Sequence, residues 1–174
     1  MDDRAIPASV AAARAPPRRY WAFLSYSHTD KVCADRLHSD LERFAVPRRF
    51  VGQMGPAGPA PTRFRPIFRD EEELGAAPDL NQRLQEALAG SGFLIVLCSP
   101  AAAASRWVDA EIRSFKAAHG EGRVLAVIVE GEPFASDDPE RAYRECLPLA
   151  LRRPVGPDGQ LGVGRIEVIA AHLR

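Results

Sequence analysis

An aromatic ring and a carboxylate lie four residues apart at Trp107 and Glu111. In an α-helix that spacing places two side chains on the same face. An indole ring can stack on a planar base, and a carboxylate can accept hydrogen bonds from ribose hydroxyls. The pair therefore suits a nucleoside. The same spacing also fits a Trp107 that packs in the core beside a Glu111 that is a solvated helix residue, and both interpretations stay open at this point.

Two further groups of polar side chains follow apolar runs of the sequence. Ser25, Tyr26, Ser27 and His28 close the first run, and an exposed charged loop from Arg69 to Gly75 follows the second. Six arginines fall between Arg43 and Arg69 with no acid among them, and four acids follow directly. This abrupt change of charge, with Leu74 as an apolar tip, fits either head-to-tail self-association or an ordinary solvated loop.

Apolar runs predict five strands, at residues 21–26, 65–68, 93–98, 124–129 and 166–170. Helical spacing and capping residues predict four helices between them, over residues 30–46, 78–90, 105–120 and 139–147. The first helix has Val32, Leu37, Leu41 and Phe44 on its apolar side. Residues 45–64, rich in Gly and Pro, and residues 99–104 are predicted to be a loop and a turn.

Strands that alternate with helices predict an α/β fold with a parallel sheet. Five strands suit a flavodoxin-like five-stranded parallel sheet of order 2-1-3-4-5 with helices on both faces. In such a sheet the crevice lies at the carboxyl ends of the strands, between strands one and three. The loops after strands one, two and three therefore bring hydroxyls, an arginine, Trp107 and Glu111 to one mouth.

The domain boundaries are predicted from composition. Residues 1–19 hold Ala, Pro and Arg and are expected to form a disordered leader, and residues 20–174 form one domain. The sequence stops directly after the fifth predicted strand, where a covering helix is expected. We therefore expect the domain to be truncated before a final helix and to belong to a longer multidomain protein.

Charge and cysteine usage narrow the class of protein. The 23 basic and 23 acidic residues balance, so no direct nucleic-acid partner is predicted. The longest apolar run, residues 93–98, is too short to span a membrane, and the first 19 residues lack the apolar stretch of a signal peptide. Three dispersed cysteines and four scattered histidines predict no disulfide framework and no metal site. A cytoplasmic protein without membrane attachment is expected.

Three linked stretches resemble the Toll/interleukin-1 receptor (TIR) domain in its bacterial form. They are residues 22–27 (AFLSYS), residues 68–70 (FRD) with Leu74-Gly75, and residues 98–100 (CSP) followed by Ser105-Arg106-Trp107 and Glu111-Ile112. The resemblance covers about residues 20–135 in the family's order. Val108 stands where many members have Cys, and the loop at 47–62 is an insertion relative to compact members.

The resemblance implies a function and a set of site residues. Many bacterial members are NAD⁺ hydrolases or cyclases used in antiphage defence, with NAD⁺ as substrate and no cofactor. Glu111 then matches the catalytic glutamate, Trp107 the aromatic residue before it, and Tyr26, Ser27 and His28 the loop that contacts the substrate. Arg69, Asp70, Leu74 and Gly75 match the BB loop. Within it, Arg69 and Asp70 are assigned to substrate binding, and Leu74 and Gly75 to the assembly of TIR domains with one another.

Two other functions remain open. Other members of the family, mainly animal receptors and adaptors, act only by TIR–TIR binding, so the chain is alternatively a non-catalytic interaction module. A nucleoside-processing enzyme of similar fold, acting on a free nucleotide, is the third possibility. Glu111 beside Trp107 favours the NAD⁺-cleaving enzyme, because an adaptor needs no acid at that position.

Overall fold

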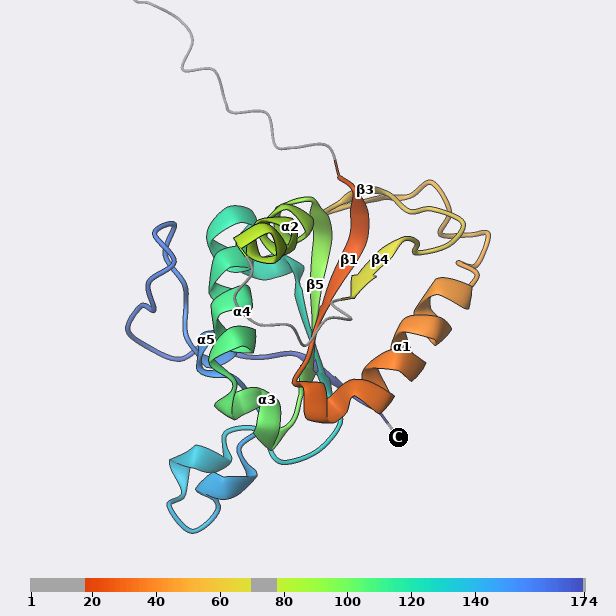
Figure 1. Cartoon of the computed structure of the whole chain (residues 1–174). Coiled ribbons are helices and arrows are strands. Elements are labelled where there is room, and N and C mark those ends of the chain that lie inside the picture. The colour runs from red at the N-terminus through yellow and green to blue at the C-terminus, as the bar shows by residue number, and fades with distance from the viewer. Residues whose placement is uncertain (1–17, 70–77, 174) are drawn as a thin grey trace, which may run out of the picture.

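A five-stranded parallel sheet forms the centre of the molecule in the computed structural model, which describes residues 18–69 and 78–173 (Figure 1). Its strands are β1 (Tyr20–Ser25), β4 (Ile67–Arg69), β5 (Ser91–Cys98), β6 (Val124–Ile128) and β7 (Ala170–His172). They lie in the order β4-β1-β5-β6-β7. Numbered along the chain, this is the predicted order 2-1-3-4-5, and every pairing is parallel. The flavodoxin-like prediction is confirmed.

Helices cover both faces of this sheet (Figure 1). The helix α1 (Lys31–Arg43) lies on one face, and α2 (Pro78–Ala89) and α4 (Arg106–His119) lie on the other. Alternate residues of β1 and β5 serve the two layers, as the pleat of a strand requires. Leu24 and Leu97 belong to the core cluster on the α1 side, whereas Phe23 and Val96 belong to the larger cluster on the α4 side.

Capping residues explain where the helices beside the mouth begin. The Ser105 hydroxyl accepts a hydrogen bond from the Val108 amide at 3.3 Å, so the predicted cap of α4 is confirmed. Residues 99–104 were expected to be a turn, and this was wrong. Ser99 caps a short helix, α3 (Pro100–Ala104), by accepting from the Ala102 amide at 3.0 Å, with Pro100 in the first turn.

The segment that follows β6 also differs from expectation. The helix predicted over 139–147 is wrong, because residues 135–137 and 142–144 form only single 3₁₀ turns, η3 (Ala135–Asp137) and η4 (Ala142–Arg144). A four-residue helix, α5 (Leu149–Arg152), comes next. The last strand lies later than predicted, since Ala170 and not Ile166 begins the pairing with β6.

The remaining segments lie at the ends of the sheet. Within the predicted loop 45–64, β2 (Met54–Gly55) and β3 (Gly58–Pro59) form a small antiparallel hairpin. Two short 3₁₀ turns, η1 (His28–Asp30) and η2 (Glu121–Arg123), precede α1 and β6. Most of the predicted leader lies outside the described residues. Its last residue, Arg19, donates its amide to the Gly90 carbonyl at 2.7 Å. No helix in the described ranges is long and apolar enough to cross a membrane.

Candidate active site

The carboxyl end of β1 faces the helix that carries the predicted carboxylate. Side chains of β1 alternate, so Ser25 points to the same side of the sheet as Phe23, toward α4. Ser25 is 2% exposed, which makes it one of the few buried polar residues of the domain. A buried hydroxyl at a strand end needs a hydrogen-bond partner, and here that partner lies on α4.

The Ser25 hydroxyl donates to the Glu111 carboxylate, with 2.5 Å between Oγ and Oε2. The two residues are 86 positions apart in the chain, so the fold and not local sequence brings them together. Glu111 is only partly buried. A short hydrogen bond to a charged acceptor is strong and directional. The contact therefore holds one oxygen of a carboxylate in place at the mouth of the sheet.

Trp107 stands one helical turn before Glu111, and 67% of it is exposed. It is therefore not a core residue, and its ring is available for a ligand. The guanidinium of Arg106 lies 5.2 Å from the centre of this ring. The first turn of α4 thus presents an exposed ring and a cation beside the carboxylate.

Contacts with α5 fix the orientation of α4. Asp109 accepts from the Ala150 amide at 2.7 Å and from Arg113 Nε at 2.7 Å. Farther along the helix, the buried Lys116 ammonium donates to the Ala150 carbonyl at 2.6 Å and pairs with Glu121 at 2.5 Å. These anchors lie two residues before and five residues after Glu111. They limit how far α4 can turn, and so they limit the position of the carboxylate.

A second contact joins the loops that follow β1 and β5. The Ser99 hydroxyl donates to Asp30 at 2.6 Å, and Ser99 is almost fully buried. In the same loop the hydroxyls of Ser27 and Thr29 lie 3.1 Å apart, and the His28 side chain is exposed. The Asp30–Ser99 contact therefore holds η1, with His28 at its start, beside α3.

Comparison with known proteins agrees with this architecture. The family described as "Thoeris protein ThsB, TIR-like domain" matches residues 23–133. The chain belongs to the TIR domain family. The matched range contains Ser25, Trp107 and Glu111. It also contains all of α4 and the last three residues of β1.

The TIR domain also resembles individual proteins. It is 36% identical over 144 residues to the "NAD(+) hydrolase ApTIR" of Actinoplanes sp., an alignment that covers 80% of this chain and 18% of the relative. The chain therefore spans less than a fifth of that protein's length. Among solved structures it is similar to the TIR domains of the activated Roq1 resistosome that directly recognises the effector XopQ. That match has 21% identity and a TM-score of 0.48, and it covers 71% of this chain and 66% of the other.

The structure separates some of the residues that the sequence placed at one mouth. Tyr26 packs against the core cluster on the α1 side of the sheet, the face opposite to Ser25. Arg69, at the end of β4, forms an ion pair with Asp35 of α1. Both side chains therefore engage the α1 layer, whereas Trp107 and Glu111 belong to α4. Asp70, Leu74 and Gly75 lie outside the described residues.

Sequence reasoning missed three residues of this TIR domain. Ser25 was noted only among the polar residues that close the first apolar run. Asp30 was only the first residue of a predicted helix, and Ser99 only the first residue of a predicted turn. A usable signal for Ser25 exists in the sequence, since a serine in phase with Phe23 on a buried strand must face the helix layer. No comparable signal links Asp30 to Ser99, because their contact depends on the spacing of two loops.

Two of the cysteines, Cys98 and Cys146, are buried, and the cavities beside α4 lie apart from Trp107 and Glu111. Burial raises the pKa of Cys98 to about 12 and that of Cys146 to about 11, so both thiols stay protonated at neutral pH. No group of three or more His, Cys, Asp or Glu residues in the described ranges is placed to hold a metal ion. A cavity of about 510 Å³ lies between α4 and residues 157–159, and neither Trp107 nor Glu111 lines it.

Proposed function

We propose that this TIR domain cleaves the nicotinamide–ribose bond of NAD⁺, with Glu111 as the catalytic residue. The contact that carries the proposal is the hydrogen bond from Ser25 to Glu111, which holds a carboxylate at the mouth beside an exposed ring. The similarity to an NAD⁺ hydrolase over 80% of the chain supports it. Both observations point to the same substrate class, a nucleotide with a ribose that the carboxylate can reach.

One carboxylate is enough for this reaction. Nicotinamide carries a positive charge in NAD⁺ and leaves as a neutral molecule, so no general acid has to protonate it. The site needs only to stabilise the ribose as it becomes an oxocarbenium ion. Glu111 does so by its negative charge and by accepting hydrogen bonds from ribose hydroxyls, which grow more acidic as the bond breaks. An ordinary glycosidase, by contrast, pairs two carboxyl groups.

The product depends on what attacks the oxocarbenium ion. Water gives ADP-ribose, nicotinamide and a proton, and attack by a nitrogen of the adenine ring gives cyclic ADP-ribose and nicotinamide. Trp107 offers its exposed face to a planar ring of the substrate, and Arg106 offers positive charge to the diphosphate. We assign Ser27 and His28 to contacts from the opposite loop. Tyr26, Arg69 and Asp70 keep their assignment to substrate binding as part of the proposal.

Self-assembly, a role in antiphage defence and a cytoplasmic location complete the proposal. The domain is expected to become active when copies cluster, with Leu74 and Gly75 in the assembly loop. A signal that clusters many copies then switches NAD⁺ consumption on. Depletion of a shared nucleotide is a response suited to stopping viral replication inside the cell.

The decisive experiment compares Glu111→Gln with the wild-type chain in an assay of NAD⁺ loss at high protein concentration. We expect turnover to be lost while the melting temperature changes little, since the substitution keeps the shape of a partly exposed side chain. Glu86→Gln, which removes an exposed charge from α2, is the matched control and should keep wild-type turnover. Full turnover by Glu111→Gln would overturn the catalytic assignment. A wild-type chain that consumes no NAD⁺ at any concentration would favour the non-catalytic interaction module.

A further inference from the structure

The segment that joins α1 to β4 gathers unpaired positive charge. Residues 43–69 contain no Asp or Glu. Five of their arginines have exposed side chains, and within the described part of the chain none of the five forms an ion pair: Arg43, Arg48, Arg49, Arg63 and Arg65. These five arginines, together with Phe50 and Met54, are called the basic surface below.

Apolar side chains are exposed within the basic surface. Met54 is 80% exposed and Phe50 is 43% exposed, and Arg49 lies 4.8 Å from the centre of the Phe50 ring. Protein interfaces are enriched in aromatic residues, Met and Arg, the residue types that are exposed here. The basic surface therefore has the character of a docking site for a protein and not of a generally solvated loop.

Internal contacts hold the basic surface in shape. The backbone of Gly52 donates to the Ala60 carbonyl at 2.8 Å, and the Ala60 amide donates back to Gln53 at 2.9 Å. Arg123, the last residue of η2, donates to the Pro56 carbonyl at 2.6 Å and so ties the hairpin to the body of the domain. A surface that is already ordered loses little entropy when it binds.

A loop of opposite charge follows β6. Residues 130–140 contain five acids and no Lys or Arg. Glu132 pairs with Arg141 and Arg144, which follow directly in the chain, and Asp137 pairs with Arg165. The carboxylates of Glu130, Asp138 and Glu140 are exposed and form no ion pair within residues 18–69 and 78–173. Tyr143, 78% exposed, supplies an apolar ring beside them. Residues 130–140 and Tyr143 are called the acidic loop below.

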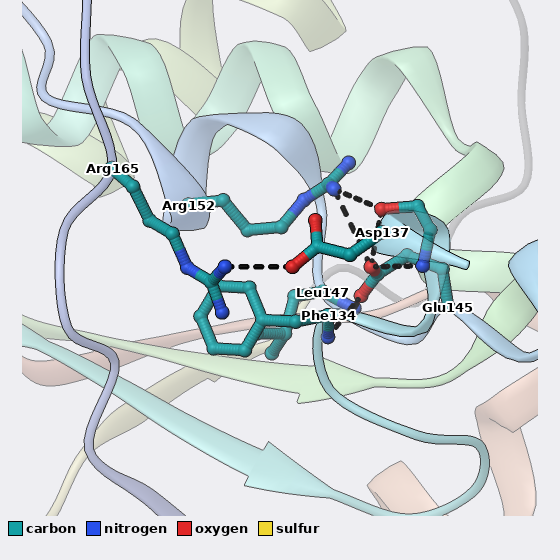
Figure 2. Close-up of polar contacts among 7 residues, drawn as sticks. Phe134, Asp137, Glu145, Leu147, Arg152 and Arg165 are labelled. Carbon is teal, nitrogen blue, oxygen red and sulfur yellow. Dashed lines mark hydrogen bonds and ion pairs between the residues drawn. The ribbon is translucent and has the colours of Figure 1, made fainter.

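A buried glutamate anchors the acidic loop (Figure 2). The Glu145 carboxylate accepts hydrogen bonds from the amides of Phe134 and Leu147 at 3.2 and 2.9 Å, and from the Ser136 hydroxyl at 2.8 Å. Arg152 of α5 lies 3.3 Å from the same carboxylate. The acidic loop is therefore as well ordered as the basic surface.

The two surfaces lie at opposite ends of the sheet. The basic surface connects the end of α1 to the amino end of β4, and the acidic loop leaves the carboxyl end of β6. In Figure 1 the orange and yellow segment 45–65 lies at the top right and the light blue segment 130–145 at the bottom left. Since the ends are separated by the length of the strands, the two surfaces of one molecule cannot meet.

We propose that the basic surface of one copy docks on the acidic loop of the next copy of this chain. The occupant is argued from charge complementarity, since the unpaired arginines and the unpaired carboxylates lie on the same molecule. Contacts between two different surfaces propagate into an open assembly unless the rotation closes a ring. The inference rests on the self-assembly in the proposed function and not on NAD⁺ cleavage. The basic surface and the acidic loop both lie outside the loop at residues 69–75.

The test is a charge swap between two variants, followed by sedimentation velocity of the full 174-residue chain at low salt. Arg48→Glu/Arg49→Glu puts two carboxylates among the remaining arginines of the basic surface, and Glu130→Arg/Glu140→Arg puts two guanidinium groups in the acidic loop. Each variant alone should lose the concentration-dependent assembly of the wild-type chain. An equimolar mixture should assemble again, because the two variants then alternate. Arg83→Glu/Arg153→Glu makes the same change of charge on exposed residues outside both surfaces and should assemble normally.

Several outcomes would overturn the pairing. The pairing is wrong if either swapped variant assembles like the wild-type chain. It is also wrong if the mixture fails to assemble while both variants keep the wild-type melting temperature. If only the arginine variant loses assembly, the basic surface docks on an anionic surface other than the acidic loop. If charge reversal unfolds a variant, the milder Arg48→Gln/Arg49→Gln and Glu130→Gln/Glu140→Gln variants must each weaken assembly. Glu111→Gln should assemble like the wild-type chain. If this variant also consumes NAD⁺ at the wild-type rate, the catalytic proposal fails while the assembly proposal stands.

Discussion

At the scale of single residues, the chemistry depends on how well one carboxylate is held. A glutamate on a helix has three side-chain torsions, and a free carboxylate spreads over many positions. The hydrogen bond from Ser25 removes part of this freedom before a substrate arrives. A preorganised charge needs no rearrangement as the oxocarbenium ion develops, which is the main source of electrostatic catalysis. Ser25 is thus a positioning residue in the proposed reaction.

Ser25→Ala tests that role against a matched substitution. Ser25 and Ser91 are both 2% exposed, and the Ser91 hydroxyl donates to the Ala87 carbonyl at 2.7 Å at the far end of the sheet. Each Ala variant should lose about 1 kcal/mol of stability, the contribution of one hydrogen bond. We expect only Ser25→Ala to lower kcat, by on the order of tenfold, with little change in KM. Ser25→Thr, which keeps the hydroxyl, should recover part of the rate. Equal kcat values for the two Ala variants would leave Ser25 with a structural role alone.

Trp107→Ala separates a binding ring from a core ring. Because the side chain is 67% exposed, truncation should cost well under the 3–5 kcal/mol of a buried aromatic residue. A stacked base contributes on the order of 1–3 kcal/mol, so the KM for NAD⁺ should rise or turnover fall by roughly tenfold or more. A thermal melt measured beside the kinetic assay checks both expectations. A collapse of the melting temperature would contradict the exposed position.

Sequence reasoning located the ring and the carboxylate but not what holds them. The four-residue spacing predicted that Trp107 and Glu111 lie on one side of a helix, and both residues do lie in α4. Exposure could not be predicted, because spacing is the same for a core face and a ligand face. Val32 shows the same limit, since it was assigned to the apolar face of α1 and is 82% exposed. Cys33, Leu37 and Leu41, which repeat every four residues, form the packed face instead.

At the scale of elements, the segment after β6 shows how one side chain decides a local structure. The amide of Leu147 donates to the Glu145 carboxylate and is therefore not available to a helix over 139–147. Phe134 also has a positive φ of 60°, which interrupts any regular element. The periodicity of residues 139–147 does not reveal the hydrogen bonds of Glu145, because they join it to residues both before and after it in the chain. Strands in the centre of the sheet were easier to predict, since residues 93–98 of β5 are apolar without interruption and almost entirely buried.

Glu145→Gln should show the contribution of that carboxylate through its pH dependence. Burial alone would raise the pKa of Glu145, but hydrogen bonds from Leu147 and Ser136, with the nearby Arg152, outweigh it and lower the pKa. A lowered pKa in the folded state stabilises the protein above the ordinary value of 4.5, and this stabilisation is lost as the pH falls through the lowered pKa.

The free energy of unfolding of Glu145→Gln should therefore be about 1–3 kcal/mol lower than that of the wild-type chain at pH 7. The difference should shrink steadily below about pH 4.5. Denaturant unfolding at several pH values measures both quantities. A difference that stays constant from pH 7 to pH 3 would show that the charge of Glu145 is not what stabilises the acidic loop.

At the scale of the whole molecule, a net charge of zero hides a strong separation of charge. The 23 basic and 23 acidic residues cancel in the sum, and this balance led to the expectation that no nucleic acid binds directly. The fold places five arginines at one end of the sheet and three carboxylates at the other, and none of these eight groups forms an ion pair within residues 18–69 and 78–173. Oppositely charged surfaces of two molecules attract each other and so favour their encounter.

The last prediction links this polarity to activity. If the domain is switched on by assembly, specific activity should rise with protein concentration and fall as added salt screens the charged contacts. Ordering of a loop by a neighbour needs only a few kcal/mol to turn a minor active population into the major one. Leu74→Asp, in the sequence that resembles the BB loop, should remove the rise in activity and leave the melting temperature unchanged. NAD⁺ consumption per molecule, measured from nanomolar to high micromolar protein at two salt concentrations, checks this. A flat profile would describe a hydrolase that works as a monomer, and assembly would then have no part in its control.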